Sequence, residues 1–169
     1  MISGNKRAPL DWNSRMKIAI GTARGVRYLH EDCRMGCVVH RDMRPNNILV
    51  THDFEPLVAD FGVARWHTEC NISSEERVIG TSGYLASEYI NSGKITETVD
   101  VFAFGVILLE LMTEQLPEFA YQLQAMGLAT SLCLHQDPKT RPPMSKYNKD
   151  VEGKTRGDSD ERSHVPSKS

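Results

Sequence analysis

Apolar residues recur at helical spacing in two long segments of the chain. In the first, the apolar positions from Ile18 to Leu29 follow one another at intervals of three or four residues, and Asp11 is suited to cap the start. The second segment begins after Thr96, a candidate N-cap, and is aliphatic on most of its faces. The pattern predicts an amphipathic helix over 12–30 and a buried helix over 97–113.

Three short aliphatic runs between these helices have the length of strands. They are Val38–Val39, Ile48–Val50 and Leu57–Ala59, and turn-prone residues separate them. Gly21 and Gly25 share one face of the first predicted helix, which either lets another element approach closely or is merely tolerated. The sequence therefore predicts a mainly α chain (α+β) with a few short strands.

Both ends of the chain are polar. Residues 1–9 and 146–169 contain too few aliphatic side chains to bury a core, so we expect a disordered N-terminus and a disordered tail. One packed domain is left over 10–145, as the length of 169 residues favours.

Charge and composition exclude several classes of function. With 20 basic and 22 acidic residues the net charge is -2, and no basic patch is interleaved with aromatic residues, so we expect no nucleic-acid partner. The longest apolar run, Val101–Leu109, is far shorter than the ~20 residues that cross a membrane. We expect no membrane span, and the absence of a disulfide framework or signal peptide predicts a cytoplasmic location.

Two polar segments offer the chemistry of a metal-dependent reaction. His40–Asn47 reads HRDMRPNN, and Asp60–Gly62, which follows after a short interval, reads DFG. Mg²⁺ prefers such carboxylate and carboxamide oxygens together with the oxygens of substrate phosphates. One carboxylate is left to accept the proton of an attacking hydroxyl, so the two segments predict phosphoryl transfer from a metal-bound nucleotide.

These segments resemble the catalytic H-R-D…N loop and the D-F-G motif of protein kinases. Three later segments are similar to further parts of that family. Gly80–Tyr89 resembles the substrate-binding loop and its closing A-P-E, Asp100–Val106 the buried central helix, and Asp137–Arg141 the segment with the arginine that pairs with the closing glutamate. From about Leu10 to Ser145 the chain resembles plant receptor-like serine/threonine kinases, close to the proline-rich extensin-like receptor kinases and their cytoplasmic relatives.

The resemblance implies a role for each residue of the catalytic segments. Asp42 would orient and deprotonate the acceptor hydroxyl, and Arg44 would stabilise the transferred phosphoryl group. Asn47 and Asp60 would hold Mg²⁺, with ATP as the phosphate donor. Leu49 would form the floor beneath adenine, with a place in the ordinary core as the alternative.

Arg41 and Thr81 would connect the catalytic segment to the activation segment and the substrate loop. By resemblance, Arg41 would grip a phosphate on Ser73, Ser74 or another hydroxyl of the activation segment. Thr81 would tie the substrate loop to Asp42 and to the basic residue two positions further on.

Two structural contacts are also implied. Asp100 would hold the backbone of the catalytic segment near His40 and Arg41, because a buried carboxylate needs hydrogen bonds. Glu88 would pair with Arg141 and so close the substrate loop against the later part of the domain.

The sequence also departs from the family pattern. No G-x-G-x-x-G loop and no V-A-I-K-type lysine precede Leu10, so the large C-terminal lobe of a kinase is expected without the small N-terminal lobe. Arg44 stands in place of a lysine, and Ser87 replaces the proline of A-P-E. Residues 122–134 resemble a later helix of the lobe, but residues 118–121 occupy the place of a longer loop and another helix.

Three hypotheses follow from the motifs and the departures. The first is a serine/threonine protein kinase by family, whose isolated chain is inactive or depends on a small lobe. The second is a non-catalytic, pseudokinase-like module that competes for the partners of a complete kinase through Gly80–Tyr89. The third is a truncated product without a stable fold. The partners would be a protein substrate or a full-length kinase, and only such a kinase or another partner would bring the chain to the plasma membrane.

Overall fold

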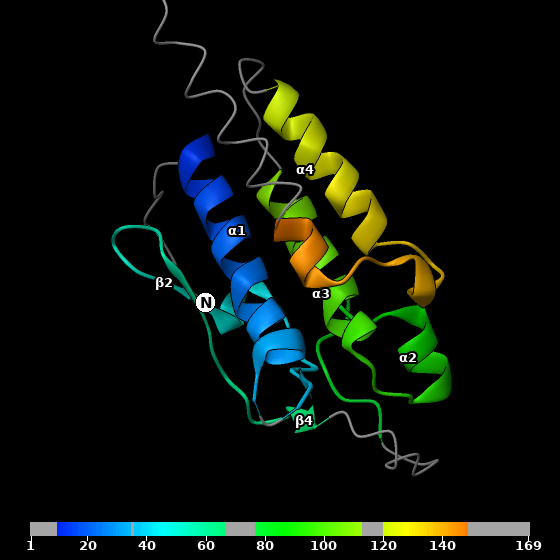
Figure 1. Ribbon diagram of the computed structural model, residues 1–169. Coiled ribbons are helices and arrows are strands. Elements are labelled where there is room, and N and C mark those ends of the chain that lie inside the picture. The colour runs from blue at the N-terminus through cyan, green and yellow to red at the C-terminus, as the bar shows by residue number, and fades with distance from the viewer. Residues whose placement is uncertain (1–9, 35, 67–76, 113–119, 149–169) are drawn as a thin grey trace, which may run out of the picture.

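The computed structural model describes residues 10–34, 36–66, 77–112 and 120–148. Its helices and strands are α1 (Trp12–Arg27), β1 (Val38–Val39), β2 (Ile48–Val50), β3 (Pro56–Val58), β4 (Arg65–Trp66), α2 (Ser87–Ser92), α3 (Glu97–Leu111) and α4 (Ala120–Cys133). Helix α3 lies between α1 and α4, and the β2–β3 hairpin packs against α1 (Figure 1). The predicted fold class, mainly α with a few short strands, is confirmed.

Helix α1 is amphipathic, as its apolar spacing predicts. The Asp11 carboxylate accepts a hydrogen bond from the Ser14 backbone N–H at 2.8 Å, which makes Asp11 the N-cap. Ile18 and Val26 lie on its buried face. The α-helix passes into a π-helical turn over Tyr28–Asp32, so the first predicted helix is confirmed.

The two glycines of α1 mark a close approach between this helix and β3. A Cβ atom built at Gly21 would lie 2.5 Å from Pro56 Cγ, and one at Gly25 would lie 2.9 Å from Val58 Cγ2. No side chain fits at either position without displacing the hairpin. Of the two interpretations, the one in which the glycines admit another element is therefore correct.

Helix α3 forms the centre of the core. Phe104 and Leu108 are fully buried, and the helix begins after Thr96, as predicted. The Thr96 side chain makes no capping hydrogen bond to the first turn, and its hydroxyl lies 2.7 Å from the Thr98 hydroxyl instead. Thr96 is therefore the N-cap residue, as predicted, but its hydroxyl pairs with the Thr98 hydroxyl and not with a backbone N–H of the first turn.

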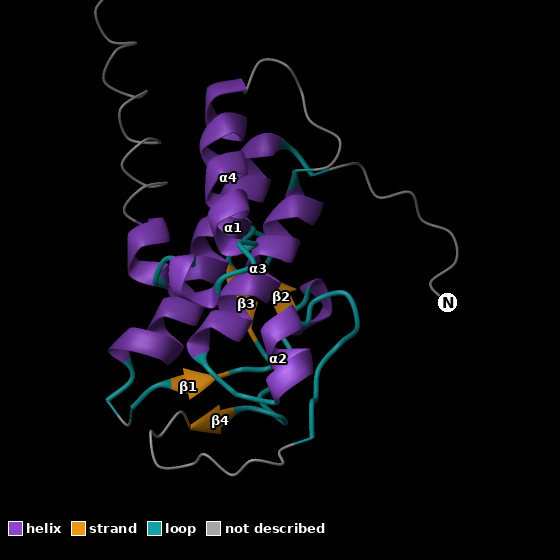
Figure 2. Cartoon of the chain, turned by 90° about the vertical axis from the view of Figure 1, so that its right-hand side faces the viewer, coloured by secondary structure: helices purple, strands orange, loops and turns teal. Residues whose placement is uncertain are grey.

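The strands form two separate antiparallel pairs, β1 with β4 and β2 with β3 (Figure 2). Leu49 is opposite Leu57 in the hairpin, and the two residues are 56% and 58% exposed. The interpretation of Leu49 as a core residue is therefore wrong. The opposite face of the hairpin, which carries Val58, packs on the core. Because successive side chains of a strand point to opposite faces, Leu49 and Leu57 point away from the core.

The last packed element is a short helix over 144–148. Tyr147 is 2% exposed, and its ring meets the Phe104 ring edge-on with the centroids 5.0 Å apart. The packed part of the chain thus extends three residues beyond the boundary expected at 145, because an aromatic ring supplies the apolar surface that the aliphatic residues lack.

The helix predicted over 122–134 is present as α4. The predictions for residues 1–9, 118–119 and 149–169 lie outside the described residues. Within the described part of the chain, no helix is long and apolar enough to cross a membrane.

Candidate active site

The buried carboxylate of Asp100, on α3, holds the start of the catalytic segment. It accepts hydrogen bonds from the backbone N–H groups of His40 at 2.7 Å and Arg41 at 2.9 Å. The backbone of Arg41 is left-handed, with φ 71°, a conformation that costs roughly 1–2 kcal/mol for a residue with a Cβ atom. The Asp100 contact expected from the resemblance is present, and it fixes this strained turn.

His30 is a further partner of Asp100 that the sequence analysis missed. Its Nε2 atom lies 2.9 Å from Asp100 Oδ2, and both side chains are almost fully buried. His30 is the last residue of the predicted helix and lies 70 positions from Asp100, so no local pattern connects the two. Nε2 must carry the proton, because a carboxylate oxygen only accepts.

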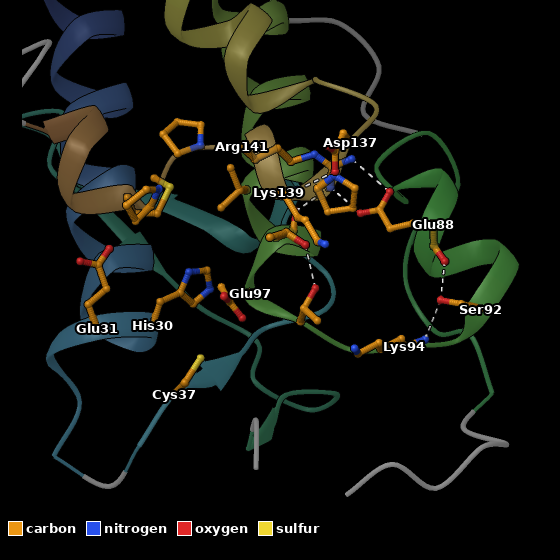
Figure 3. A pocket seen from close by; sticks show the side chains of 17 residues that line it. His30, Glu31, Cys37, Glu88, Ser92, Lys94, Glu97, Asp137, Lys139 and Arg141 are labelled. Carbon is orange, nitrogen blue, oxygen red and sulfur yellow. Dashed lines mark hydrogen bonds and ion pairs between the residues drawn. The ribbon is translucent and has the colours of Figure 1, made fainter. Parts of the chain in front are cut away.

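His30 also borders a cavity of about 690 Å³. Figure 3 shows the cavity with His30 and Cys37 on one side and Glu88 on the other. Its lining does not include Asp42 or Asp60. The cavity is therefore separate from the two acidic side chains of the catalytic segments.

The His40 side chain connects the two catalytic segments. Its Nε2 lies 3.0 Å from the Ala59 carbonyl oxygen, and its Nδ1 accepts from the Asp42 backbone N–H at 3.3 Å. These bonds select the tautomer with the proton on Nε2. The His40 ring also packs against the Phe61 ring, with the centroids 5.0 Å apart. The DFG segment is thereby placed next to the catalytic loop.

Asp42 is held from several sides by polar side chains. Its Oδ1 accepts from the Thr81 hydroxyl at 2.6 Å, and its Oδ2 accepts from Asn47 Nδ2 at 3.1 Å. Asn47 Nδ2 also donates to the Asp42 carbonyl at 2.8 Å. Arg44 Nε lies 3.4 Å from Asp42 Oδ2, close enough for an ion pair, although this nitrogen makes no hydrogen bond to any of the described residues. Thr81 and Arg44 therefore meet at the Asp42 carboxylate.

Asp60 is exposed and loosely held by comparison. Its backbone is left-handed, with φ 64°, and among the described residues its carboxylate accepts one hydrogen bond, from the Gly62 N–H at 3.4 Å. Asn47 uses its amide nitrogen on Asp42, which leaves its amide oxygen for another partner. A carboxylate and an amide oxygen are ligand types that Mg²⁺ accepts together with phosphate oxygens.

The substrate loop is closed by an ion pair. Arg141 is buried and donates from both Nη atoms to the Glu88 carboxylate, the Nη2 bond being 3.0 Å long. The Arg141 guanidinium also lies over the Phe102 ring, 5.0 Å from its centroid. The contact expected between Glu88 and Arg141 is therefore present, and Ser87 in place of proline does not prevent it.

Arg41 contacts a tyrosine that the sequence analysis did not consider. Its Nη2 donates to the Tyr89 hydroxyl at 3.0 Å, and its Nε does so at 3.3 Å. Ser73 and Ser74, the hydroxyls expected to carry a phosphate for Arg41, lie outside the described residues. That part of the prediction remains a proposal.

Comparison with known proteins identifies the family. The protein kinase domain model matches residues 2–128. The chain is 53% identical over 113 residues to the proline-rich receptor-like protein kinase PERK10 of Arabidopsis thaliana. The matched region covers 67% of this chain and 15% of the relative. It is 51% identical to PERK7 and 50% identical to PERK1 of the same plant, in each case over 116 residues and 69% of this chain, and 16% and 18% of the relative respectively.

The chain therefore belongs to the protein kinase family, and its resemblance to plant proline-rich receptor-like kinases is confirmed. It spans less than a fifth of the length of these curated relatives. The matched region contains the catalytic and substrate segments described above.

Proposed function

We propose that this chain carries the hydroxyl-accepting and metal-binding part of a serine/threonine protein kinase site. The reaction is transfer of the ATP γ-phosphate to a protein hydroxyl. The observation that carries the proposal is the Asp42 carboxylate, which Thr81 and Asn47 hold at separate oxygens. A base fixed in this way can receive a proton from a hydroxyl without first reorganising.

Thr81 links the substrate loop directly to the Asp42 carboxylate. It belongs to the substrate loop, so the 2.6 Å bond from its hydroxyl to Asp42 places that loop beside the base. A substrate bound along the loop then presents its hydroxyl to the free lone pairs of Asp42. Arg44, beside the same carboxylate, supplies positive charge near the transferred group.

Asn47 and Asp60 would hold Mg²⁺, through an amide and a carboxylate oxygen respectively. In protein kinases the bound metal neutralises charge on the phosphates of ATP. The exposed Leu49 side chain offers an apolar surface for the adenine ring. The printed sequence contains no G-x-G-x-x-G loop. Since each charge-assisted phosphate contact is worth about 1.5–3 kcal/mol, we expect this chain alone to bind nucleotide weakly and to be inactive without further nucleotide contacts.

Calorimetric titration with Mg²⁺ and a non-hydrolysable ATP analogue tests the metal site. The variant Asp60→Asn removes the charge but keeps a side chain that tolerates the left-handed backbone. Asp53→Asn removes an exposed carboxylate in the β2–β3 turn and is the matched control. Binding that is lost in the first variant and kept in the second supports the proposal. Absence of binding at millimolar nucleotide, in a chain that melts cooperatively, contradicts it.

A second function, a binding module for kinase partners, is favoured by the closed substrate loop. The Glu88–Arg141 pair and the hydrogen bond from the Tyr84 hydroxyl to Glu110 shape this loop without any contribution from a nucleotide. The double variant Gly83→Asp, Tyr84→Ala should weaken capture of a complete relative's kinase domain or its substrate. Equal capture by this variant and by the control Leu128→Asp, on the exposed face of α4, would count against the binding module.

A further inference from the structure

The substrate loop meets the catalytic loop at a second point besides the Thr81–Asp42 bond. The Tyr89 hydroxyl, at the start of α2, accepts hydrogen bonds from Arg41 Nη2 at 3.0 Å, from Arg41 Nε at 3.3 Å and from the Ile79 backbone N–H at 3.1 Å. Tyr89 is fully buried and Arg41 is 3% exposed. The phenol oxygen therefore links Arg41 to the segment that leads into the substrate loop, beside the bonds that Arg41 itself donates to the Arg77 and Val63 carbonyl oxygens at 3.4 Å.

The backbone packing at this point leaves little room for movement. A Cβ atom at Gly80 would lie 2.7 Å from the Arg41 carbonyl oxygen, so the substrate loop passes directly over the catalytic loop. Gly80 has φ 138°, a conformation that favours glycine. Ile79 and Thr81 flank Gly80. The Ile79 backbone N–H donates to the Tyr89 hydroxyl, and the Thr81 hydroxyl donates to the Asp42 carboxylate.

We propose that the Tyr89 hydroxyl is a positioning group that anchors the substrate loop to Arg41 and thereby keeps Thr81 at Asp42. The anchor consists of a phenol, a guanidinium and a backbone amide, and none of these groups requires a phosphate. The tie between the two loops is thus built into the fold, and a phosphate on the activation segment adds to it rather than creating it. Its contribution to substrate positioning rests on the proposed function, whereas the anchor itself does not.

The variant Tyr89→Phe removes only the hydroxyl, and amide hydrogen exchange reads the result. The Ile79 amide loses its acceptor, so its exchange should become about five- to tenfold faster, the effect of losing one hydrogen bond of roughly 1 kcal/mol. The Gly93 amide donates to the Tyr89 carbonyl at 2.8 Å and reports the stability of α2 independently of the hydroxyl. Tyr84→Phe, which removes another tyrosine hydroxyl of the same loop, is the matched control.

A rise at Ile79 alone in Tyr89→Phe supports the anchor. An equal rise in the exchange rates of the Ile79 and Gly93 amides would mean that the hydroxyl contributes only to general stability, which overturns the proposal. An unchanged exchange rate at Ile79 overturns it as well. On the wild-type chain, treated with phosphatase and verified by intact mass, the Arg41 Nε–H should show a protected NMR signal. A signal that becomes protected only after phosphorylation would also overturn it. Neither measurement depends on kinase activity or nucleotide binding, so failure of the proposed function leaves this test valid.

Discussion

The two acidic side chains of the site differ sharply in how the fold holds them. Asp42 lies in a loop whose backbone is held by the buried Asp100 carboxylate. Thr81 and Asn47 donate hydrogen bonds to the Asp42 carboxylate itself. Asp60 is exposed, and one long hydrogen bond to its own turn holds its carboxylate. The hairpin that precedes Asp60 in the chain also exposes Leu49.

This difference separates what folding determines from what a ligand must complete. The loop that carries Asp42 obtains its shape from side chains of the same folded unit, so the Asp42 carboxylate is in place once the chain has folded. The position of Asp60 depends on a left-handed backbone and on the packing of Phe61 against His40. Variants on the two sides should therefore affect different quantities.

The largest expected effect comes from Asp100→Asn, which changes the carboxylate that holds the loop of Asp42. The substitution keeps the shape of the side chain but turns an amide N–H toward groups that donate to the carboxylate. The free energy of unfolding should fall by about 3 kcal/mol, as when one member of a buried charged network is removed. Urea denaturation measures it, with the exposed Asp53→Asn as control. A loss below about 1 kcal/mol would show that Asp100 does not hold the loop.

The packing that supports the hairpin gives the next effect. In Gly21→Ala the new Cβ meets Pro56 at 2.5 Å, so the hairpin must move and the free energy of unfolding should fall by about 1–3 kcal/mol. Gly127→Ala in α4 is the matched control, because no other part of the described structure lies within 4 Å of a Cβ there. The control should stabilise the chain by about 0.5–1 kcal/mol. Thermal melts with the same sign for both variants would contradict the close approach.

Thr81→Val and Asp60→Asn should separate stability from binding. Loss of the Thr81 hydroxyl removes one hydrogen bond to Asp42 and should lower the free energy of unfolding by about 1 kcal/mol, with little change in Mg²⁺–nucleotide affinity. Asp60→Asn should leave the melting temperature nearly unchanged and abolish the calorimetric binding signal. If both variants changed stability and binding in proportion, the two sides of the site would not be independent.

Local patterns in the sequence predicted the parts of the molecule that depend on neighbouring residues. The cap at Asp11, the helix after it and the buried helix that contains Phe104 follow from periodicity, and the catalytic segments follow from their motifs. The spacing of Gly21 and Gly25 left a close approach and mere tolerance equally open, and it did not indicate that β3 would be the approaching element.

Contacts between distant side chains could not be predicted in this way. His30 meets Asp100 across 70 positions, and Tyr89 meets Arg41 across 48. Neither histidine nor tyrosine carries a local signal for such a partner. Leu49 was open to interpretation as a core residue because an aliphatic run has the same composition whether one face or both faces are covered. Only the arrangement of α1 beside the hairpin decides which face is buried.

The smallest expected effect concerns the influence of Glu97 and Asp100 on the reactivity of the Cys37 thiol. Burial, together with the negative charges of Glu97 and Asp100, raises the pKa of the Cys37 thiol to about 11, so at pH 8 the thiol is almost entirely protonated. Glu97→Gln removes one of these charges, lowers that pKa and should speed alkylation of Cys37 by iodoacetamide several-fold. Peptide mass spectrometry at pH 8 measures the rate, with Glu110→Gln as the control, since Glu110 acts on Tyr84 instead. Equal rates in the wild type and in Glu97→Gln would mean that the Glu97 carboxylate does not influence the Cys37 thiol, and that burial and Asp100 set its reactivity.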